Sequence, residues 1–366
     1  MTNVLLAGGG TAGHVNPLIA VGKKLAGENL FALATPGGLE HELLPQAGIP
    51  LFQIPKVPAP RRPNMDAVRF PRQFVAAVST VEKLIVEKRI NVVVGFGGFV
   101  ATPAYLAAKK VGVPIVIHEQ NVRPGLANKL GARWAKAIAL TFADTKLAAR
   151  QGITEVTGLP LRPEIEELAT AVDRAQRQQR ARAMFDLDPQ LPVLLVTGGS
   201  LGAQKINEAV VDSLGAVRGF QILHLAGKGK VTVSSTSTYK VREYCLNMED
   251  AFAAADLVLS RSGAGSVSEI TALCLPAVYV PLAIGNGEQK LNAAAVVKAG
   301  GAYMVPNDKF DIKTLRDIVF PLVVNPQKLS DMSTRTRVLA RPDAAVRVAN
   351  LVRQVANFKA PEPFER

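Results

Sequence analysis

The sequence predicts an α/β protein built from two Rossmann-like, doubly wound domains. Its 366 residues exceed one ordinary core and suit two domains of usual size. An apolar run, a glycine-rich turn and a helical pattern open the chain, and the same succession restarts in its second half. Alternating strand and helix signals are typical of parallel sheets covered by helices. We expect residues 1–160 and 161–340 to form the two domains. Residues 341–366 are expected to form a C-terminal helix whose packing partner stays open, the first domain included.

The composition excludes several classes of protein. Apolar residues make up 48% and charged residues 20%, as in folded globular proteins. The most apolar segment, Val92 to Ile117, is interrupted by glycine, proline and lysine, and is therefore not a membrane-spanning helix. No leader pattern precedes the first strand, so we expect a cytoplasmic protein. Two cysteines and four scattered histidines give neither a disulfide framework nor metal-ligand spacing, and we expect no metal or cofactor.

Positive charge is concentrated in the first half. Residues 1–162 contain 19 basic and nine acidic side chains, whereas the remaining residues contain 24 basic and 21 acidic ones. This asymmetry indicates nucleic acid or an anionic membrane as a partner, and a solvated basic face is the simpler alternative.

The stretch from Lys56 to Arg89 carries the strongest basic pattern, and it includes a predicted amphipathic helix that reaches Ile85. Basic residues around exposed apolar ones suit contact with a membrane, although the apolar side chains could equally face the core. The residues concerned are Arg61, Arg62, Arg69, Phe70, Arg72 and Phe74.

The first glycine turn, Gly8 to Gly13, follows a predicted strand, Asn3 to Ala7, and precedes a helix expected over residues 15–26. Its glycine spacing satisfies the dinucleotide-binding fingerprint. That fingerprint also requires an acidic residue at the end of the next strand to hold a ribose, and Thr35 and Pro36 stand there instead. The sequence therefore disfavours a dehydrogenase.

His14 follows this turn at the expected start of a helix. The positive end of a helix dipole disfavours an imidazolium ion, so the ring is expected to stay neutral at physiological pH. A neutral imidazole beside a phosphate-sized cleft can accept a proton, as a general base must. An isolated histidine is usually structural, but this position favours the functional interpretation.

A polar cluster, His118 to Asn121, follows the predicted strand Val113 to Ile117. Binding and catalytic groups collect at the carboxyl ends of parallel strands. For His118 and Glu119 we favour an ordinary polar loop, and the pattern leaves Asn121 undecided.

The second half of the chain repeats the first. Residues 157–163 are rich in proline and glycine and indicate a linker. After a polar helix expected over residues 172–185, the run 192–203 resembles the start of the chain, and 257–292 repeats the succession of 92–121. Two such halves predict a ligand in the cleft between their facing strand ends.

The stretch from Asp256 to Pro281 is the predicted functional centre. A strand, a glycine-rich turn and a helix opened by Ser266 would direct backbone N–H groups at an anion such as phosphate. Glu269 has two interpretations. Its spacing from Ser266 is that of a capping box, in which the carboxylate only closes the helix start. Alternatively, the carboxylate accepts hydrogen bonds from ribose hydroxyls beside the phosphate.

These motifs together resemble the MurG family of bacterial peptidoglycan glycosyltransferases, and they occur in the family's order across nearly the whole chain. The matching segments are Gly9–Pro17, Gly95–Phe99, His118–Asn121 with Asn128 and Lys129, Gly158–Arg162, Gly198–Ala203, Arg261–Ala264, Ser268–Ile270, and Gln289 with Asn292. The resemblance implies the GT-B architecture, two Rossmann-like domains facing a cleft. It also implies inverting transfer of N-acetylglucosamine from UDP-N-acetylglucosamine to the 4-hydroxyl of undecaprenyl-linked muramyl-pentapeptide, converting lipid I to lipid II.

The resemblance further implies roles for individual residues. His14 would assist removal of the proton from the acceptor hydroxyl. Thr11, Ala12, Gly13 and Asn121 would lie at the sugar and diphosphate on the side of the first domain. The residues implied in contact with the UDP-sugar are Arg162, Ser200, Ala264, Gly265, Ser266, Glu269 on the ribose, and Gln289, with backbone near Cys245 facing the uracil.

Because the acceptor's lipid tail stays in the bilayer, the basic stretch becomes the expected contact with an anionic membrane, not with nucleic acid, at the cytoplasmic face.

Two positions depart from the family pattern. Ala12 replaces a third glycine and narrows the room for a diphosphate, and Leu246-Asn247 replaces a more acidic pair. Two alternatives stay open: another UDP-sugar transferase or epimerase on this fold, or a non-catalytic UDP-sugar-binding membrane scaffold, against which His14 and Glu269 argue.

Overall fold

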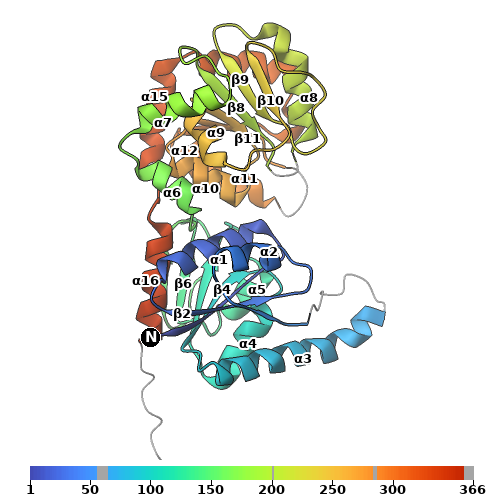
Figure 1. Ribbon diagram of the computed structural model, residues 1–366, viewed down its shortest axis with the longest axis vertical. Coiled ribbons are helices and arrows are strands. Elements are labelled where there is room, and N and C mark those ends of the chain that lie inside the picture. The colour runs from blue at the N-terminus through green and yellow to red at the C-terminus, as the bar shows by residue number, and fades with distance from the viewer. Residues whose placement is uncertain (56–64, 200–201, 283–286, 358–366) are drawn as a thin grey trace, which may run out of the picture. The chain divides into compact units, whose positions relative to one another are not determined.

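Contacts between residues divide the chain into two compact units (Figure 1). The computed structural model describes residues 1–55, 65–199, 202–282 and 287–357. Unit 1 comprises Met1–Arg162 with Asp343–Arg366, and unit 2 comprises Pro163–Pro342. Each unit has its own parallel sheet covered by helices, which confirms the predicted class of two Rossmann-like α/β domains.

Among the described residues, seven parallel strands form the sheet of unit 1 in the order β3-β2-β1-β4-β5-β6-β7. Their bounds are β1 Asn3–Gly8, β2 Asn29–Ala34, β3 Leu51–Gln53, β4 Val92–Gly97, β5 Ile115–Glu119, β6 Ala137–Leu140 and β7 Ile153–Val156. The strand order reverses between β1 and β4. Doubly wound sheets bind ligands at this switch point, outside the carboxyl ends of the strands.

Helices cover both faces of this sheet (Figure 1). They are α1 Ala12–Lys24, α2 Glu40–Gln46, α3 Met65–Glu87, α4 Ala101–Val111, α5 Leu126–Gly131 and α16 Ala344–Ala356. Successive residues of β1 point to opposite faces, as in any strand. Leu5 and Ala7 therefore join a core with α3 and α4, whereas Val4 and Leu6 join a core with α1 and α16.

The C-terminal helix α16 belongs to unit 1. It packs against α1 and against β4, β5 and β6. A guanidinium nitrogen of Arg353 donates to the carbonyl oxygen of Lys24 at 2.8 Å, and Arg347 Nη1 lies 3.2 Å from Glu155 Oε1. The last described helix therefore completes the domain in which the chain begins.

Six described strands form the parallel sheet of unit 2 in the order β10-β9-β8-β11-β12-β13. Their bounds are β8 Val193–Thr197, β9 Gln221–Leu225, β10 Tyr239–Arg242, β11 Leu257–Ser260, β12 Ala277–Tyr279 and β13 Ala302–Met304. The α-helices are α6 Pro163–Thr170, α7 Arg174–Met184, α8 Gln204–Ser213, α9 Met248–Ala254, α10 Ala264–Ala272, α11 Glu288–Asn292, α12 Ala294–Lys298, α13 Ile312–Thr314, α14 Phe320–Val323 and α15 Pro326–Arg337. Two 3-10 turns, η1 Leu214–Ala216 and η2 Asn307–Lys309, and a π-helical turn, η3 Leu315–Val319, complete the described helical elements of unit 2.

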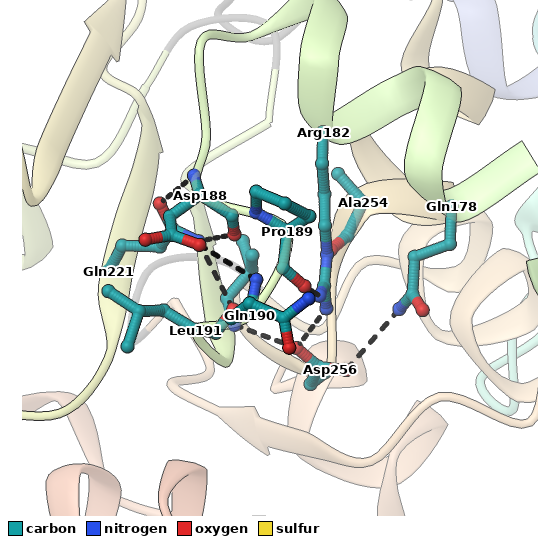
Figure 2. A network of polar contacts seen from close by, with 10 residues as sticks. Gln178, Arg182, Asp188, Pro189, Gln190, Leu191, Gln221, Ala254 and Asp256 are labelled. Carbon is teal, nitrogen blue, oxygen red and sulfur yellow. Dashed lines mark hydrogen bonds and ion pairs between the residues drawn. The ribbon is translucent and has the colours of Figure 1, made fainter.

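An ion pair between Arg182 and Asp256 joins α7 to the amino ends of β8 and β11 (Figure 2). Arg182 Nη2 lies 2.6 Å from Asp256 Oδ2, and the same oxygen accepts from the backbone N–H of Val193 at 2.7 Å. The guanidinium also donates to the carbonyl oxygens of Pro189 and Ala254. A largely buried charge is thus fully paired, as stability requires.

Two helices begin earlier than the sequence predicted. Helix α1 starts at Ala12 and not at residue 15, and α10 starts at Ala264 and not at Ser266. Within the described residues, no helix combines the length and apolar content that crossing a bilayer needs.

Candidate functional site

His14 lies in the first turn of α1, directly after the glycine turn that follows β1. Its Nδ1 is 3.1 Å from the carbonyl oxygen of Gly9 and 3.1 Å from Thr11 Oγ1. A carbonyl oxygen can only accept, so when the ring is neutral Nδ1 carries the hydrogen and Nε2 carries the lone pair. The local fold thereby selects the tautomer in which Nε2 can accept a proton.

Two glycines at the end of β4 make room for the His14 ring. Gly97 and Gly98 have positive φ angles of 92° and 77°. A Cβ on Gly97 would lie 3.2 Å from both Cδ2 and Nε2 of His14, and a Cβ on Gly98 would lie 2.6 Å from the carbonyl oxygen of Gly9. Glycine at these two positions therefore lets the turn after β4 lie in close contact with the turn after β1 and with His14.

Glu40 is a site residue that the sequence analysis missed. Its buried carboxylate accepts from the backbone N–H of Gly10 at 3.2 Å, and from the N–H and the hydroxyl of Thr35 at 3.1 Å each. The dinucleotide fingerprint requires an acidic residue at the end of β2, whereas Glu40 is the first residue of α2 and its side chain reaches back to the glycine turn. Gly9 and Gly38, which leave space for the carboxylate, were the signal that could have revealed it.

His118 and Glu119 form a buried network and not the ordinary polar loop that was expected. The Glu119 carboxylate accepts from the backbone N–H groups of Asn121 and Gly125 and from Asn128 Nδ2, at 2.9 to 3.0 Å. Burial raises the pKa of Glu119, and these hydrogen bonds oppose the shift. Burial lowers the pKa of His118 to about 4, so this ring is neutral at physiological pH.

This network holds the loop after β5 beside the start of α1. The Gln120 side chain lies so close to Gly13 that a Cβ there would be 3.1 Å from Gln120 Oε1. The backbone of Asn121 is fixed at both ends, because its N–H donates to Glu119 and its carbonyl accepts from Thr145 Oγ1 at 3.2 Å. Thr11, Ala12 and Gly13 are exposed at the same edge of the sheet. Unit 1 thus brings together its predicted group of Thr11 to His14 with the loop that carries Asn121.

In unit 2, the helix α10 begins without a side-chain cap. Gly263 is the N-cap residue and makes no side-chain capping bond. Ser266 and Glu269 are the third and sixth residues of the helix, so the capping-box interpretation of Glu269 is wrong. The first N–H groups of a helix have no acceptor within it, and its N-terminus carries partial positive charge. Ala264, Gly265 and Ser266 supply these groups.

Arg261 holds the turn before α10. Its Nη1 donates to the carbonyl oxygen of Val280 at 2.9 Å and to Asn307 Oδ1 at 2.6 Å. Burial lowers the pKa of this guanidinium. The sequence pattern indicated Arg261 only as part of a motif and did not indicate Asn307, because no local signal shows that η2 comes within hydrogen-bond distance of Arg261.

The remaining predicted contacts lie on separate segments, Gln289 in α11 and both Cys245 and Arg162 in loops. Gln289 Oε1 accepts from the backbone N–H of Leu282 at 2.9 Å, which orients its amide. Cys245 Sγ lies 3.2 Å from the carbonyl oxygen of Asn247. Arg162 is half-buried at the end of unit 1. Ser200 lies outside the described residues.

The basic stretch is described from α3 onward, so Arg61 and Arg62 also lie outside the described residues. Arg69 and Arg72 are exposed. The rings of Phe70 and Phe74 stack at 5.6 Å, and Phe74 meets the ring of Phe99 edge-on at 6.2 Å. Further along α3, Ala77, Val81, Leu84 and Ile85 are buried at helical spacing, while Val75 is 66% exposed. The helix therefore combines a core-facing stripe with exposed basic and apolar side chains.

Two family models match the chain. Residues 4–140 match the glycosyltransferase family 28 N-terminal domain, and residues 193–348 match the glycosyltransferase family 28 C-terminal domain.

Two curated relatives carry the same name, UDP-N-acetylglucosamine--N-acetylmuramyl-(pentapeptide) pyrophosphoryl-undecaprenol N-acetylglucosamine transferase. The relative from Clavibacter sepedonicus is 47% identical, and the match covers 100% of both chains. The relative from Paenarthrobacter aurescens (strain TC1) is 44% identical, and the match covers 96% of this chain and 95% of the relative.

Solved structures share the fold. A crystal structure of Acinetobacter baumannii MurG is 28% identical with a TM-score of 0.78, over 97% of this chain and 100% of that one. The UDP-GlcNAc 2-epimerase from Neisseria meningitidis is 15% identical with a TM-score of 0.67, over 97% and 99% of the two chains, and this likeness shows the fold alone.

Proposed function

The chain belongs to glycosyltransferase family 28, and on that premise we propose that it transfers N-acetylglucosamine from UDP-N-acetylglucosamine to lipid-linked N-acetylmuramyl-pentapeptide. The transfer converts lipid I to lipid II in peptidoglycan synthesis. The observation that carries this function is 47% identity over the full length of a relative named for it. The resemblance to MurG drawn from the motifs is confirmed by the same relatives and by the MurG structure.

In this reaction the 4-hydroxyl oxygen of the acceptor attacks the anomeric carbon of N-acetylglucosamine. The bond from that carbon to the diphosphate oxygen breaks, and its electron pair leaves with UDP. The hydroxyl proton passes to a base, and the anomeric configuration inverts because no covalent enzyme intermediate forms.

His14 is the residue that we assign as this base. The assignment is supported by the hydrogen bond of Nδ1 with Gly9, which leaves Nε2 as the nitrogen that accepts a proton. Thr11, Ala12, Gly13 and Asn121 would contact the reacting sugar and the diphosphate from unit 1. This role is supported by the position of these four residues at the carboxyl ends of the strands, around the turn that carries His14.

The N-terminus of α10 is our assignment for the leaving diphosphate. Negative charge develops there as the glycosidic bond breaks, and aligned N–H groups stabilise that charge without reorganising. The absence of a side-chain cap at Gly263 supports this role. Glu269 would accept from the ribose hydroxyls, a role that we propose from the family resemblance.

Other contacts with the UDP-sugar are proposed from the family resemblance. They are Arg162, Ser200 and Gln289, with backbone near Cys245 beside the uracil. For Gln289, the bond of its amide oxygen with Leu282 supports a fixed orientation.

The basic stretch of α3 is our proposal for contact with an anionic membrane. Arg69 and Arg72 can meet lipid headgroups, and the adjacent half-buried pair Phe70 and Phe74 can reach the acyl boundary. An enzyme whose acceptor stays in the bilayer must act there, so we place it peripherally at the cytoplasmic face of the cell membrane.

A transfer assay with radiolabelled UDP-N-acetylglucosamine tests the function. Label on a lipid-linked muramyl-pentapeptide supports it. Label on another acceptor, or epimerised free sugar nucleotide, would indicate the other enzymes that share the fold. Binding of the sugar nucleotide without any turnover would indicate a scaffold.

A further inference from the structure

Glu40 and His14 are linked through a single peptide group. Gly9 supplies the carbonyl oxygen that receives the His14 Nδ1 hydrogen, and Gly10 supplies the N–H that donates to Glu40 Oε2. Those two atoms belong to the same planar unit, because a peptide bond joins the carbonyl of one residue to the N–H of the next. A rotation of this plane would therefore break both hydrogen bonds together.

Gly9 and Gly10 have no side chains that could restrain the orientation of this peptide plane. Gly10 has a φ of 84° and open space where a Cβ would stand. Glycine is the most permissive residue for backbone rotation, so neither Gly9 nor Gly10 fixes the plane by itself. The contact with Glu40 supplies the restraint from outside the turn.

The fold makes a place for the carboxylate. A Cβ on Gly9 would lie 2.8 Å from Glu40 Oε1, and a Cβ on Gly38 would lie 2.3 Å from Glu40 Cδ. The Glu40 side chain is fully buried. Burial acts to raise the pKa of Glu40, but the backbone hydrogen bonds outweigh it and hold the pKa below its usual value. The group is therefore an anion at neutral pH.

The position of this anion differs from that in a dinucleotide site. There, N–H groups of the glycine turn face a bound pyrophosphate. Here the N–H of Gly10 faces a carboxylate of the protein itself. The turn is therefore anchored internally, and a hydrogen bond to the negative carboxylate is stronger than one between neutral groups. It also polarises the peptide, which strengthens the bond that the Gly9 carbonyl accepts.

We propose that Glu40 is a positioning residue that acts through the Gly9–Gly10 peptide to hold the His14 ring in its reactive tautomer and orientation. The inference rests on the proposed role of His14 as the base. Glu40 does not touch substrate in this account, so its loss should affect the chemical step and leave donor binding in place.

The test replaces the carboxylate by an amide. In Glu40→Gln, one of the two oxygens becomes an NH2 group, which cannot accept a hydrogen bond. Two donors of Thr35 bind one carboxylate oxygen and only the N–H of Gly10 binds the other, so we expect the amide oxygen to stay with Thr35 and the bond from Gly10 to be lost. We expect kcat to fall by about tenfold or more, with KM for UDP-N-acetylglucosamine within about twofold of wild type. Glu42→Gln is the matched control, because Glu42 is exposed on the same helix. That variant should keep wild-type kcat.

NMR of the histidine ring nitrogens gives a readout that a purely structural role would not move. The chain has four histidines, and His14→Ala identifies the His14 signals by their loss. In wild type, we expect Nδ1 to show the shift of a protonated nitrogen and Nε2 that of an unprotonated one. In Glu40→Gln, the two shifts should move toward each other as the tautomers mix.

Gly38→Ala provides a second variant, because its new Cβ would push the carboxyl group aside without altering it. Gly38 does not use the left-handed backbone region, so alanine adds no backbone strain there. Gly38→Ala should reproduce both the fall in kcat and the change in the His14 nitrogen shifts. It tests the role of Glu40 if Glu40→Gln does not fold.

Unchanged His14 shifts in a folded variant of either kind would overturn the proposal, even if kcat falls, since Glu40 would then act by another route. Failure of the wild-type protein to transfer sugar would instead refute the proposed function. The ring-nitrogen comparison does not depend on that activity, so the two failures can be told apart.

Discussion

Glu40 and His14 bond to opposite ends of one peptide group, at 3.2 Å through the N–H of Gly10 and at 3.1 Å through the carbonyl of Gly9. A buried acid on α2 and an imidazole on α1 are thus joined through the glycine turn. This arrangement leaves Nε2 of His14 as the nitrogen that accepts a proton, and the first prediction follows from that role.

Replacing His14 by alanine should reduce turnover by about tenfold or more, the usual range for lost acid–base assistance. The acceptor hydroxyl would lose its proposed base, whereas the proposed donor site in unit 2 would be intact. Steady-state rates with lipid I and UDP-N-acetylglucosamine measure the effect. Gly97→Ala should act in the same direction, because its Cβ would press on the ring at 3.2 Å and occupy a strained φ. A wild-type rate in His14→Ala would remove His14 from the mechanism.

Replacing Glu269 by alanine should also reduce turnover by about tenfold or more, through weaker contact with the donor ribose. The helix should persist, because Glu269 is the sixth residue of α10 and lies beyond its first turn. Titration with UDP, followed by heat flow, separates binding from chemistry. Unaltered UDP affinity together with an unaltered rate would exclude the ribose contact.

Acidification should destabilise the fold as His118 and His224 resist protonation. Burial lowers the pKa of each to about 4 from an ordinary 6.5. Between these values the unfolded chain binds more protons at these sites, so stability is full above pH 6.5 and is lost as pH falls toward 4. Urea unfolding at several pH values measures this slope.

His224→Gln isolates one of the two contributions. His224 bonds to Tyr239 and Asn207, and glutamine does not titrate. The slope of unfolding free energy against pH should become shallower in that window, by up to about 1.4 kcal/mol per pH unit. Identical slopes in wild type and variant would contradict the depressed pKa of His224.

Replacing Asp256 by alanine should lower the free energy of unfolding by about 2–4 kcal/mol, because it leaves the Arg182 charge largely buried without its partner. The N–H of Val193 would lose its acceptor as well. Asp317→Ala removes an exposed pair with Lys313 and should leave stability unchanged. Equal denaturation midpoints for the two variants would contradict the importance of the network in Figure 2.

Reversing Arg61, Arg62, Arg69 and Arg72 to glutamate should weaken binding to anionic vesicles by at least about tenfold, since each basic residue near such a surface contributes roughly 1 kcal/mol. Cosedimentation with vesicles of anionic lipid measures the binding. The control reverses four exposed basic residues of unit 2, namely Lys228, Lys309, Arg316 and Lys328. Equal loss in both variants would show a general charge effect and not a membrane site on α3.

The sequence by itself determined the fold class and most of the candidate site. Apolar runs, glycine turns and helical periodicity are local signals, and each predicts an element without knowledge of its neighbours. The two parallel sheets follow from that alternation. So does the placement of His14, the loop after β5 and the start of α10 at carboxyl ends of strands, where such sheets present functional groups.

Only the tertiary structure decided which distant residues meet. Glu40 reaches a turn 30 residues earlier in the chain, and α16 packs on the unit where the chain begins. It also decided that α10 starts at Ala264, which removed the capping role of Glu269. Local patterns do not specify these outcomes. A buried carboxylate or an apolar helix face gains its stability from whichever partner the folded chain brings to it, and a helix end depends on where backbone groups find acceptors.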